Sequence, residues 1–285
     1  MECEAPPAPE KSVRSLYFVL ALTGFFFFIE LLGGFWTGSL ALLADAMHMA
    51  VDLIALGMTL FAAHVSRRPP DAKRTFGYQR VEVLAALGNG VWLLVAMGII
   101  LHEAYLRFSH PSPVLAGPML AIAAVGFLCN LVSGFVLFSA GKENINLRGA
   151  FLHVAADAFG SLGAMGAGAV ILKTGWTRAD PVASAIICCA IIVTSVWLVR
   201  DSVHILLEGA PAHLDLEHIR ASLAALAGVK EVHDLHLWSL TKGSESLSGH
   251  LVVEPGRDPA GVLKAGTELL NERFGLSHVT LQIET

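Results

Sequence analysis

Charged residues are scarce in this 285-residue chain. Asp, Glu, Lys and Arg make up 15% of it and hydrophobic residues 54%, whereas an average soluble domain has about 25% charged residues. So little charge cannot cover a soluble globule of this size, which argues against a disordered chain, a fibrous repeat and an ordinary cytosolic enzyme. The net charge is -5, so the composition gives no case for nucleic acid as a partner.

Cysteine is scarce as well, with four residues in the chain and no CxxC pair. Cys188 and Cys189 are adjacent within an apolar run, where cysteine usually serves as a small hydrophobic side chain. The chain also lacks the HExxH motif of zinc proteases. These absences argue against a disulfide framework and against that class of membrane metalloenzyme.

Long apolar blocks fill most of the chain up to Gly209. About 20 helical residues cross the hydrocarbon core of a bilayer, and six blocks reach that length: Tyr17–Trp36, Leu40–Val65, Val81–Phe108, Val114–Ala140, Leu147–Leu172 and Pro181–Leu207. We therefore expect six transmembrane helices within residues 16–208.

Lys and Arg are distributed unevenly between the segments that connect these blocks. With the N-terminus inside, one side of the membrane carries Lys11, Arg14, Arg67, Arg68, Lys73, Arg74, Arg80, Lys142, Arg148 and Arg200, and the other carries only Arg107, Lys173 and Arg178. The positive-inside rule then places both termini in the cytoplasm. The segment 1–15, with its three prolines, is expected to be a cytoplasmic tail rather than a signal peptide.

The composition changes at residues 209–285. Apolar residues at helical spacing in Leu214–Ala227 and Pro259–Phe274 predict two helices, and Glu231–Leu240, Ser246–Glu254 and His278–Glu284 are typical of strands. The order αββαβ suggests a small α+β domain like a ferredoxin-type metallochaperone. At about 75 residues such a domain is near the lower limit for a self-sufficient core, so we expect dimer contacts to help stabilise it.

Two of the apolar blocks carry the same pair of ionisable residues. ADAMHMAVD places His48 and Asp52 four residues apart, and AFLHVAADAFGS does the same with His153 and Asp157. That spacing puts both side chains on one helix face. Imidazole and carboxylate groups suit a divalent transition metal, and four of them suit tetrahedral Zn²⁺. A pair of structural hydrogen bonds is the alternative reading, which the repetition at membrane depth makes less favourable.

Charge balance within this four-residue set suggests how it could transport an ion. With neutral imidazoles the empty site carries two negative charges, which one Zn²⁺ or two protons would neutralise. Unneutralised charge is costly in a low-dielectric interior. A carrier should therefore switch between its inward-facing and outward-facing states either loaded with metal or protonated. Asp45 precedes His48 on the same face and is a candidate for a supporting or pathway residue.

Several segments together resemble the cation diffusion facilitator family: SLALLADAMHMAVD, TFGYQRVEVLAAL, the second HxxxD pair, VHDLHLWSL and HVTLQIE. The resemblance extends from about Leu16 to Glu284 and is strongest to cobalt–zinc–cadmium resistance proteins and vesicular zinc transporters. It implies a homodimer that exports Zn²⁺ from the cytoplasm in exchange for H⁺, with His48, Asp52, His153 and Asp157 as transport ligands. Co²⁺ and Cd²⁺ are further cargoes of such proteins.

The resemblance also assigns roles outside the membrane helices. It implies a second zinc site in the C-terminal domain with His233, His250 and Glu284 as ligands, and a charge interlock between protomers at Arg80 and Glu208. Some members bind metal in the loop after the second span through an Asp and two His. Here Asp71 matches the Asp, but Arg74 and Tyr78 replace the histidines, so no metal is expected there.

These expectations favour a transporter in a bacterial inner membrane over two other classes. A membrane metalloenzyme would need an open coordination position beside a base. A membrane-anchored metal sensor or chaperone would explain the C-terminal domain but not two HxxxD pairs inside the bilayer. Substituting the C-terminal ligands distinguishes a transporter from a sensor. A sensor should lose its metal response entirely, whereas a transporter with an intact membrane site should keep some metal flux.

Overall fold

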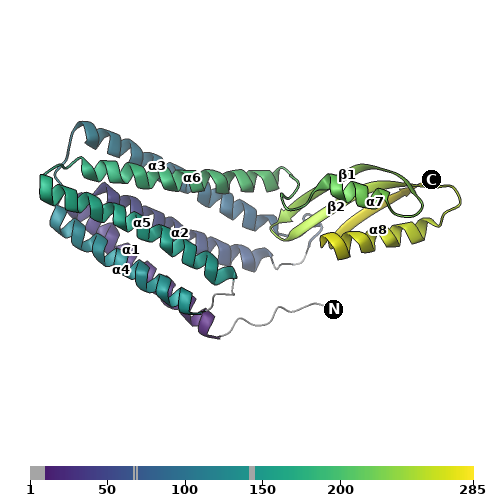
Figure 1. Ribbon diagram of the computed structural model, residues 1–285, viewed down its shortest axis with the longest axis horizontal. Coiled ribbons are helices and arrows are strands. Elements are labelled where there is room, and N and C mark those ends of the chain that lie inside the picture. The colour runs from purple at the N-terminus through teal and green to yellow at the C-terminus, as the bar shows by residue number, and fades with distance from the viewer. Residues whose placement is uncertain (1–9, 67, 69, 141–144) are drawn as a thin grey trace. The chain divides into compact units, whose positions relative to one another are not determined.

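The computed structural model describes residues 10–66, 68, 70–140 and 145–285, and its first part is helical throughout (Figure 1). Six long helices come first, in the order expected from the apolar blocks: α1 Glu10–Thr37, α2 Leu40–Ser66, α3 Arg80–Ser109, α4 Ala116–Ala140, α5 Ile145–Thr174 and α6 Ala179–Leu206. The rest of the chain has the order αββαβ: α7 Leu216–Ala224, β1 Val229–Thr241, β2 Ser244–Val253, α8 Pro259–Phe274 and β3 His278–Glu284. The expected fold class is confirmed.

Five of the described helices are long and apolar enough to cross a membrane: α1, α3, α4, α5 and α6. In each, 28–39% of the most apolar window is buried inside the protein, so most of that apolar surface is available to lipid. The 27-residue α2 has a sufficient length too. It remains the expected sixth span, and it carries one of the two HxxxD pairs.

By its internal contacts the chain divides into two units. One contains Met1–Leu56 and Asn89–Val196, and the other contains Gly57–Gly88 and Trp197–Thr285. The division therefore runs through α2, α3 and α6, and the second unit includes the α2–α3 loop together with the C-terminal α+β domain.

Small residues let the helices of the first unit approach closely. A methyl group at Gly126 of α4 would lie 2.5 Å from the Phe26 ring of α1, and one at Gly160 of α5 would lie 3.0 Å from an oxygen of Asp45 on α2. Both are closer than most side-chain carbons come to a neighbour, so a larger residue at either position would require Phe26 or Asp45 to move. Gly160 thus permits the close approach of α5 to α2.

A buried carboxylate from α6 fixes the start of α2. Asp180 accepts hydrogen bonds from the Ser39 hydroxyl at 2.6 Å and from the backbone N–H groups of Leu40 at 2.8 Å and Ala41 at 3.2 Å. The first N–H groups of a helix have no partner within the helix. Asp180 therefore acts as an N-cap contributed by another helix, which ties the beginnings of α2 and α6 together.

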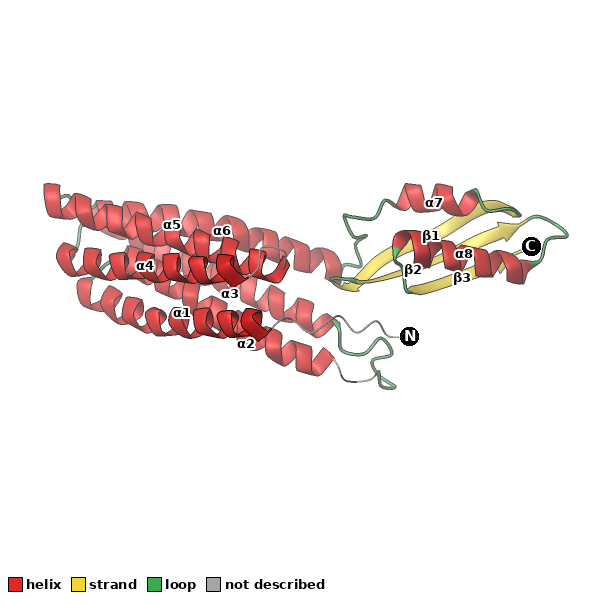
Figure 2. Ribbon diagram, turned by 60° about the horizontal axis from the view of Figure 1, so that its bottom comes forward, coloured by secondary structure: helices red, strands yellow, loops and turns green. Residues whose placement is uncertain are grey.

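In the second unit a three-stranded sheet has the order β1-β2-β3 (Figure 2). β1 and β2 pair antiparallel, and β2 and β3 pair parallel across the α8 connection. α8 contacts β3 and α7, and its Gly266 faces Leu223, Leu251 and Leu281. The two short helices therefore share one face of the sheet. We call the opposite face, which includes His233, His250 and Glu284, the open face.

Candidate metal sites

The first candidate site joins α2 to α5 through His48. Its Nε2 atom lies 3.5 Å from Asp52 Oδ2 on the same helix and 3.5 Å from Asp157 Oδ1 on α5. Asp157 is 8% exposed, and the side chains of His48 and Asp52 are 17% and 29% exposed. Three of the four residues named from the HxxxD spacing thus come together. The fourth, His153, belongs to α5, and its side chain lies outside the described residues.

A second set of polar side chains lies beside these three. Asp45 Oδ2 accepts a hydrogen bond from the Ser161 hydroxyl at 3.4 Å, and Ser161 accepts one from the Asn130 amide at 3.3 Å. Asp45 and Ser161 are buried. Asp45 therefore belongs to a polar link between α2, α4 and α5. The sequence alone does not mark Ser161 as a functional residue, since single serines are common in packed membrane helices.

Glu30 of α1 is fully buried in the same unit. One of its carboxylate oxygens would lie 3.0 Å from a methyl group at Gly126 of α4. With Asp45, Asp157 and Asp180, the first unit has buried acidic residues on four of its helices, α1, α2, α5 and α6. Buried acidic residues within membrane helices are costly.

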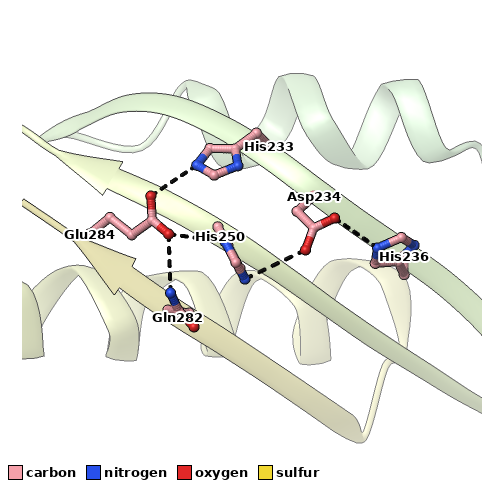
Figure 3. A network of polar contacts seen from close by, with 6 residues as sticks. All are labelled: His233, Asp234, His236, His250, Gln282 and Glu284. Carbon is pink, nitrogen blue, oxygen red and sulfur yellow. Dashed lines mark hydrogen bonds and ion pairs between the residues drawn. The ribbon is translucent and has the colours of Figure 1, made fainter.

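The second candidate site lies on the open face of the sheet (Figure 3). Glu284 reaches two imidazoles: its Oε2 is 3.0 Å from His233 Nε2, and its Oε1 is 3.0 Å from His250 Nδ1. One potential ligand atom from each residue lies within 4.8 Å of the others. Among the residues that the structure describes, these three form the one cluster of His, Cys, Asp or Glu that meets this criterion.

Strand alternation explains why these ligands share a face. Val232, Leu251 and Ile283 belong to the core beneath the sheet, and each adjoins one of the three ligands, so the ligands point the other way. The antiparallel register sets His233 directly opposite His250, and the parallel register brings β3 alongside β2. Two imidazoles and a carboxylate are a donor set that suits zinc, with one coordination position left for a further ligand.

Hydrogen bonding lowers the pKa of the Glu284 carboxyl below its ordinary value. The bond with His233 is the main cause, and the charges of His233 and His250 add to it, while partial burial acts in the opposite direction. The carboxyl is therefore ionised at neutral pH, the form that binds a metal ion.

Asp71 in the α2–α3 loop is held by its own loop. Its carboxylate accepts hydrogen bonds from the Tyr78 hydroxyl at 2.7 Å and from the backbone N–H groups of Lys73 at 2.7 Å and Arg74 at 2.8 Å. Tyr78 is the main reason that the pKa of Asp71 lies below its ordinary value. Arg74 and Tyr78 stand where the family resemblance implies histidines, and here the Arg74 N–H and the Tyr78 hydroxyl both donate to Asp71.

Arg80 and Glu208 form an ion pair within the single chain, with Arg80 Nη2 3.0 Å from Glu208 Oε1. Both belong to the second unit, and their side chains are 36% and 65% exposed. The interlock between protomers that the family resemblance assigns to them remains a prediction.

Two family models match the chain. The one described as "Cation efflux transmembrane domain" matches residues 16–207, and the one described as "Cation efflux protein, cytoplasmic domain" matches residues 211–285. The chain thus belongs to the cation efflux family, a family of membrane transporters rather than enzymes.

Curated relatives match along nearly the whole chain. The cation efflux system protein CzcD of Alcaligenes sp. (strain CT14) is 40% identical over 97% of this chain and 88% of its own length. The zinc transporter ZitB of Escherichia coli is 40% identical, and the cadmium, cobalt and zinc/H(+)-K(+) antiporter of Bacillus velezensis is 39% identical, each over 96% of this chain and 88% of the relative.

A solved structure also matches the C-terminal part. It is the metal-bound C-terminal domain of the CzcD transporter from Cupriavidus metallidurans, 36% identical, covering 25% of this chain and 100% of that one, with a TM-score of 0.24.

Proposed function

We propose that this protein exports Zn²⁺ from the cytoplasm in exchange for H⁺, with Co²⁺ and Cd²⁺ as further cargoes. The proposed mechanism is alternating access around a tetrahedral site formed by His48, Asp52, His153 and Asp157. The names of the relatives support the cargo and the antiport, since they include a zinc transporter and an antiporter of cadmium, cobalt and zinc.

The observation that carries the proposal is the position of His48 between two carboxylates. Its Nε2 atom is 3.5 Å from an oxygen of each. Ligand atoms about 2.0–2.1 Å from a tetrahedral zinc ion lie about 3.3 Å from one another. Both His48 distances are close to that value, which supports His48 as a ligand shared with each carboxylate, and His153, one turn before Asp157 on α5, would be the fourth ligand.

Charge balance supports the exchange of zinc for protons. Asp157 is almost fully buried, and an unneutralised carboxylate pair in that environment is costly. A dication or two protons would each bring the site to neutrality. The carrier would then switch between inward-facing and outward-facing states when it is metal-bound or protonated, and seldom when it is empty and deprotonated.

The remaining assignments complete the proposal. Residues 1–15 would be a cytoplasmic tail, 16–208 the transport domain, and 209–285 a cytoplasmic domain for metal binding and dimerisation, in a bacterial inner membrane with both termini inside. The second family model is named for a dimer, which supports a homodimer. His233, His250 and Glu284 would hold a resident zinc ion, and Asp45 would support His48.

Zinc uptake into proteoliposomes with an imposed pH gradient tests the transport site. Only proteins whose cytoplasmic side faces the outside of the liposome should be counted, which sidedness controls establish. For these wild-type proteins an acidic lumen should drive zinc into the liposome as protons leave it. Asp157→Ala should reduce this flux to the level of empty liposomes, because the site loses one ligand and half of its negative charge.

Glu272→Gln, which removes an exposed carboxyl of α8, is the matched control and should transport at the wild-type rate. Full flux through Asp157→Ala would remove the proposed transport site. Zinc flux that ignored the pH gradient would instead contradict the exchange and point to a uniporter.

A further inference from the structure

An irregularity in β1 brings an extra carboxylate to the open face. Val232 and Leu235 both belong to the core beneath the sheet, although they are three residues apart. In a regular strand, residues that share a face are separated by an even number of positions. The register with β2 shifts by one residue between His233 and His236, which is the signature of a β-bulge.

The bulge places His233 and Asp234 in succession on the open face, with His236 beyond them (Figure 3). Asp234 has a φ of 49°, in the left-handed region. This conformation is unfavourable for most residues other than glycine, and aspartate and asparagine are among those that tolerate it best. Strained backbone of this kind, when it occurs in well-packed structure, often serves a site.

The Asp234 carboxylate lies between two imidazoles. Its Oδ2 is 3.6 Å from His250 Nε2, and its Oδ1 is 2.9 Å from His236 Nε2. The first distance is in ion-pair range and slightly longer than a hydrogen bond. His236 therefore fixes the carboxylate from one side, and the other oxygen faces the ring of His250.

His250 uses its two ring nitrogens in opposite directions. Nδ1 faces Glu284 at 3.0 Å, toward the proposed metal, and Nε2 faces Asp234. A histidine that binds a metal through one nitrogen commonly donates its other N–H to a carboxylate, which fixes the tautomer, orients the ring and makes the ligand more basic. Because Asp234 lies on the far side of the ring from Glu284, it cannot bind the same ion as a fourth ligand.

We propose that Asp234, held by His236 and set in place by the bulge of β1, is a positioning residue that orients His250 as an Nδ1 ligand of the cytoplasmic metal site. This inference rests on the proposed zinc site of His233, His250 and Glu284. It assigns a function to the strained position and explains why a carboxylate, rather than glycine, occupies it.

Zinc affinity measured in the full chain tests this assignment. The membrane ligands are removed first by His48→Ala and Asp52→Ala, so that zinc titrated against a chromophoric chelator reports the C-terminal site alone. In that background Asp234→Ala and Asp234→Gly should weaken zinc binding about 10- to 100-fold, the usual effect of losing a carboxylate that orients a metal-binding histidine. Asp234→Asn should have a smaller effect, since its amide oxygen can take the place of Oδ2 opposite His250 Nε2.

Thermal unfolding of the metal-free variants separates positioning from a purely structural role. Asp234→Gly relieves the strained backbone, so it should melt no lower than the background chain while binding zinc more weakly. Glu231→Gln removes an exposed carboxyl from the same strand and should change neither quantity.

Three outcomes would overturn the proposal. Zinc affinity within twofold of the background in all Asp234 variants would show that the carboxylate does not position His250. Loss of one of two bound ions, with the other unaffected, would make Asp234 a direct ligand of a second ion. A background chain that binds zinc no better than its Glu284→Ala variant would show that the underlying site is absent, which is a distinct failure.

Discussion

His48 is the residue on which cargo selection should depend most. It is the imidazole among the three described groups that converge between α2 and α5, and it faces a carboxylate on each side. Replacing it with a carboxylate would change both the geometry and the softness of the donor set. The HxxxD spacing made this convergence predictable within each helix, because four residues return to the same face.

We predict that His48→Asp loosens discrimination against Cd²⁺. A shorter, charged and less directional ligand suits a larger cation better than the imidazole does. The ratio of zinc to cadmium flux in proteoliposomes should fall, by about tenfold if the change is worth roughly 1.4 kcal/mol. An unchanged ratio would mean that selectivity is determined elsewhere in the chain.

At the α2–α3 loop, Asp71 gives a prediction that depends on pH. The pKa of Asp71 is lowered in the folded loop. The stabilisation of the loop by the ionised carboxylate is therefore fully present above the ordinary pKa of aspartate, and it is lost as the pH falls through the lowered pKa. Asp71→Ala should therefore speed hydrogen exchange at the backbone N–H groups of Lys73 and Arg74 at neutral pH, and wild type should approach the variant at acidic pH.

Lys73→Gln is the control for the loop, since Lys73 contributes its backbone N–H rather than its side chain to the bond with Asp71. It should leave the exchange rates unchanged. Equal exchange in wild type and Asp71→Ala at neutral pH would contradict the role given to this carboxylate.

Other functional residues could not be found from the sequence. Asp180, Ser161 and Asp234 have partners 141, 116 and 16 positions away, respectively, in Ser39, Asp45 and His250. Periodicity reports which face of its own element a residue occupies, but it does not report which residue of another element lies opposite. These contacts depend on how the helices and strands pack.

At the scale of elements, the helix boundaries expected from the sequence agree best with the observed ones where capping residues mark the helix ends. The expected Pro259–Phe274 is the observed α8, bounded by the N-cap Asp258 and by Gly275 in the left-handed conformation. α1 begins at Glu10, earlier than the expected Tyr17, because apolar runs mark the membrane-spanning part of a helix and not the helical turns beyond it. The bulge in β1 was missed since it interrupts the alternation used to predict strands.

The cap that α6 provides for α2 should contribute measurably to stability. We predict that Asp180→Ala lowers the free energy of unfolding by on the order of 2–4 kcal/mol, because three hydrogen bonds to a buried charged acceptor are lost. Thermal unfolding in detergent, followed by tryptophan fluorescence, measures the effect.

Ser39→Ala is the graded comparison for this cap, since it removes one of the three donors. It should cost about 1 kcal/mol. If Asp180→Ala and Ser39→Ala were equally mild, the capping role would be contradicted.

At the scale of the whole molecule, the sequence predicted the family and the αββαβ order of the C-terminal domain. Both follow from patterns that are local: long apolar runs, HxxxD repeats and strand alternation. The composition changes at residue 209, whereas the division into two units runs through α2, α3 and α6. It depends on which helix segments contact one another.

We predict that the purified protein is a homodimer in detergent. Light scattering corrected for bound detergent should give a protein mass of two 30.3-kDa chains, and the small size of the C-terminal domain is a physical reason for association. A mass of one chain at micromolar protein concentration would contradict the assignment.

The bulge at Asp234 separates the side chain that it presents from the packing of the sheet. Deleting Asp234 alone would leave Val232, His233 and Leu235 in regular alternation, so Val232 and Leu235 would both stay in the hydrophobic interior. Deleting a residue elsewhere in β1 would instead force every side chain on one flank to exchange sides of the sheet. Homologous genes should therefore lose a codon at this position more readily than at its neighbours, and those that have lost it would lack the carboxylate opposite His250.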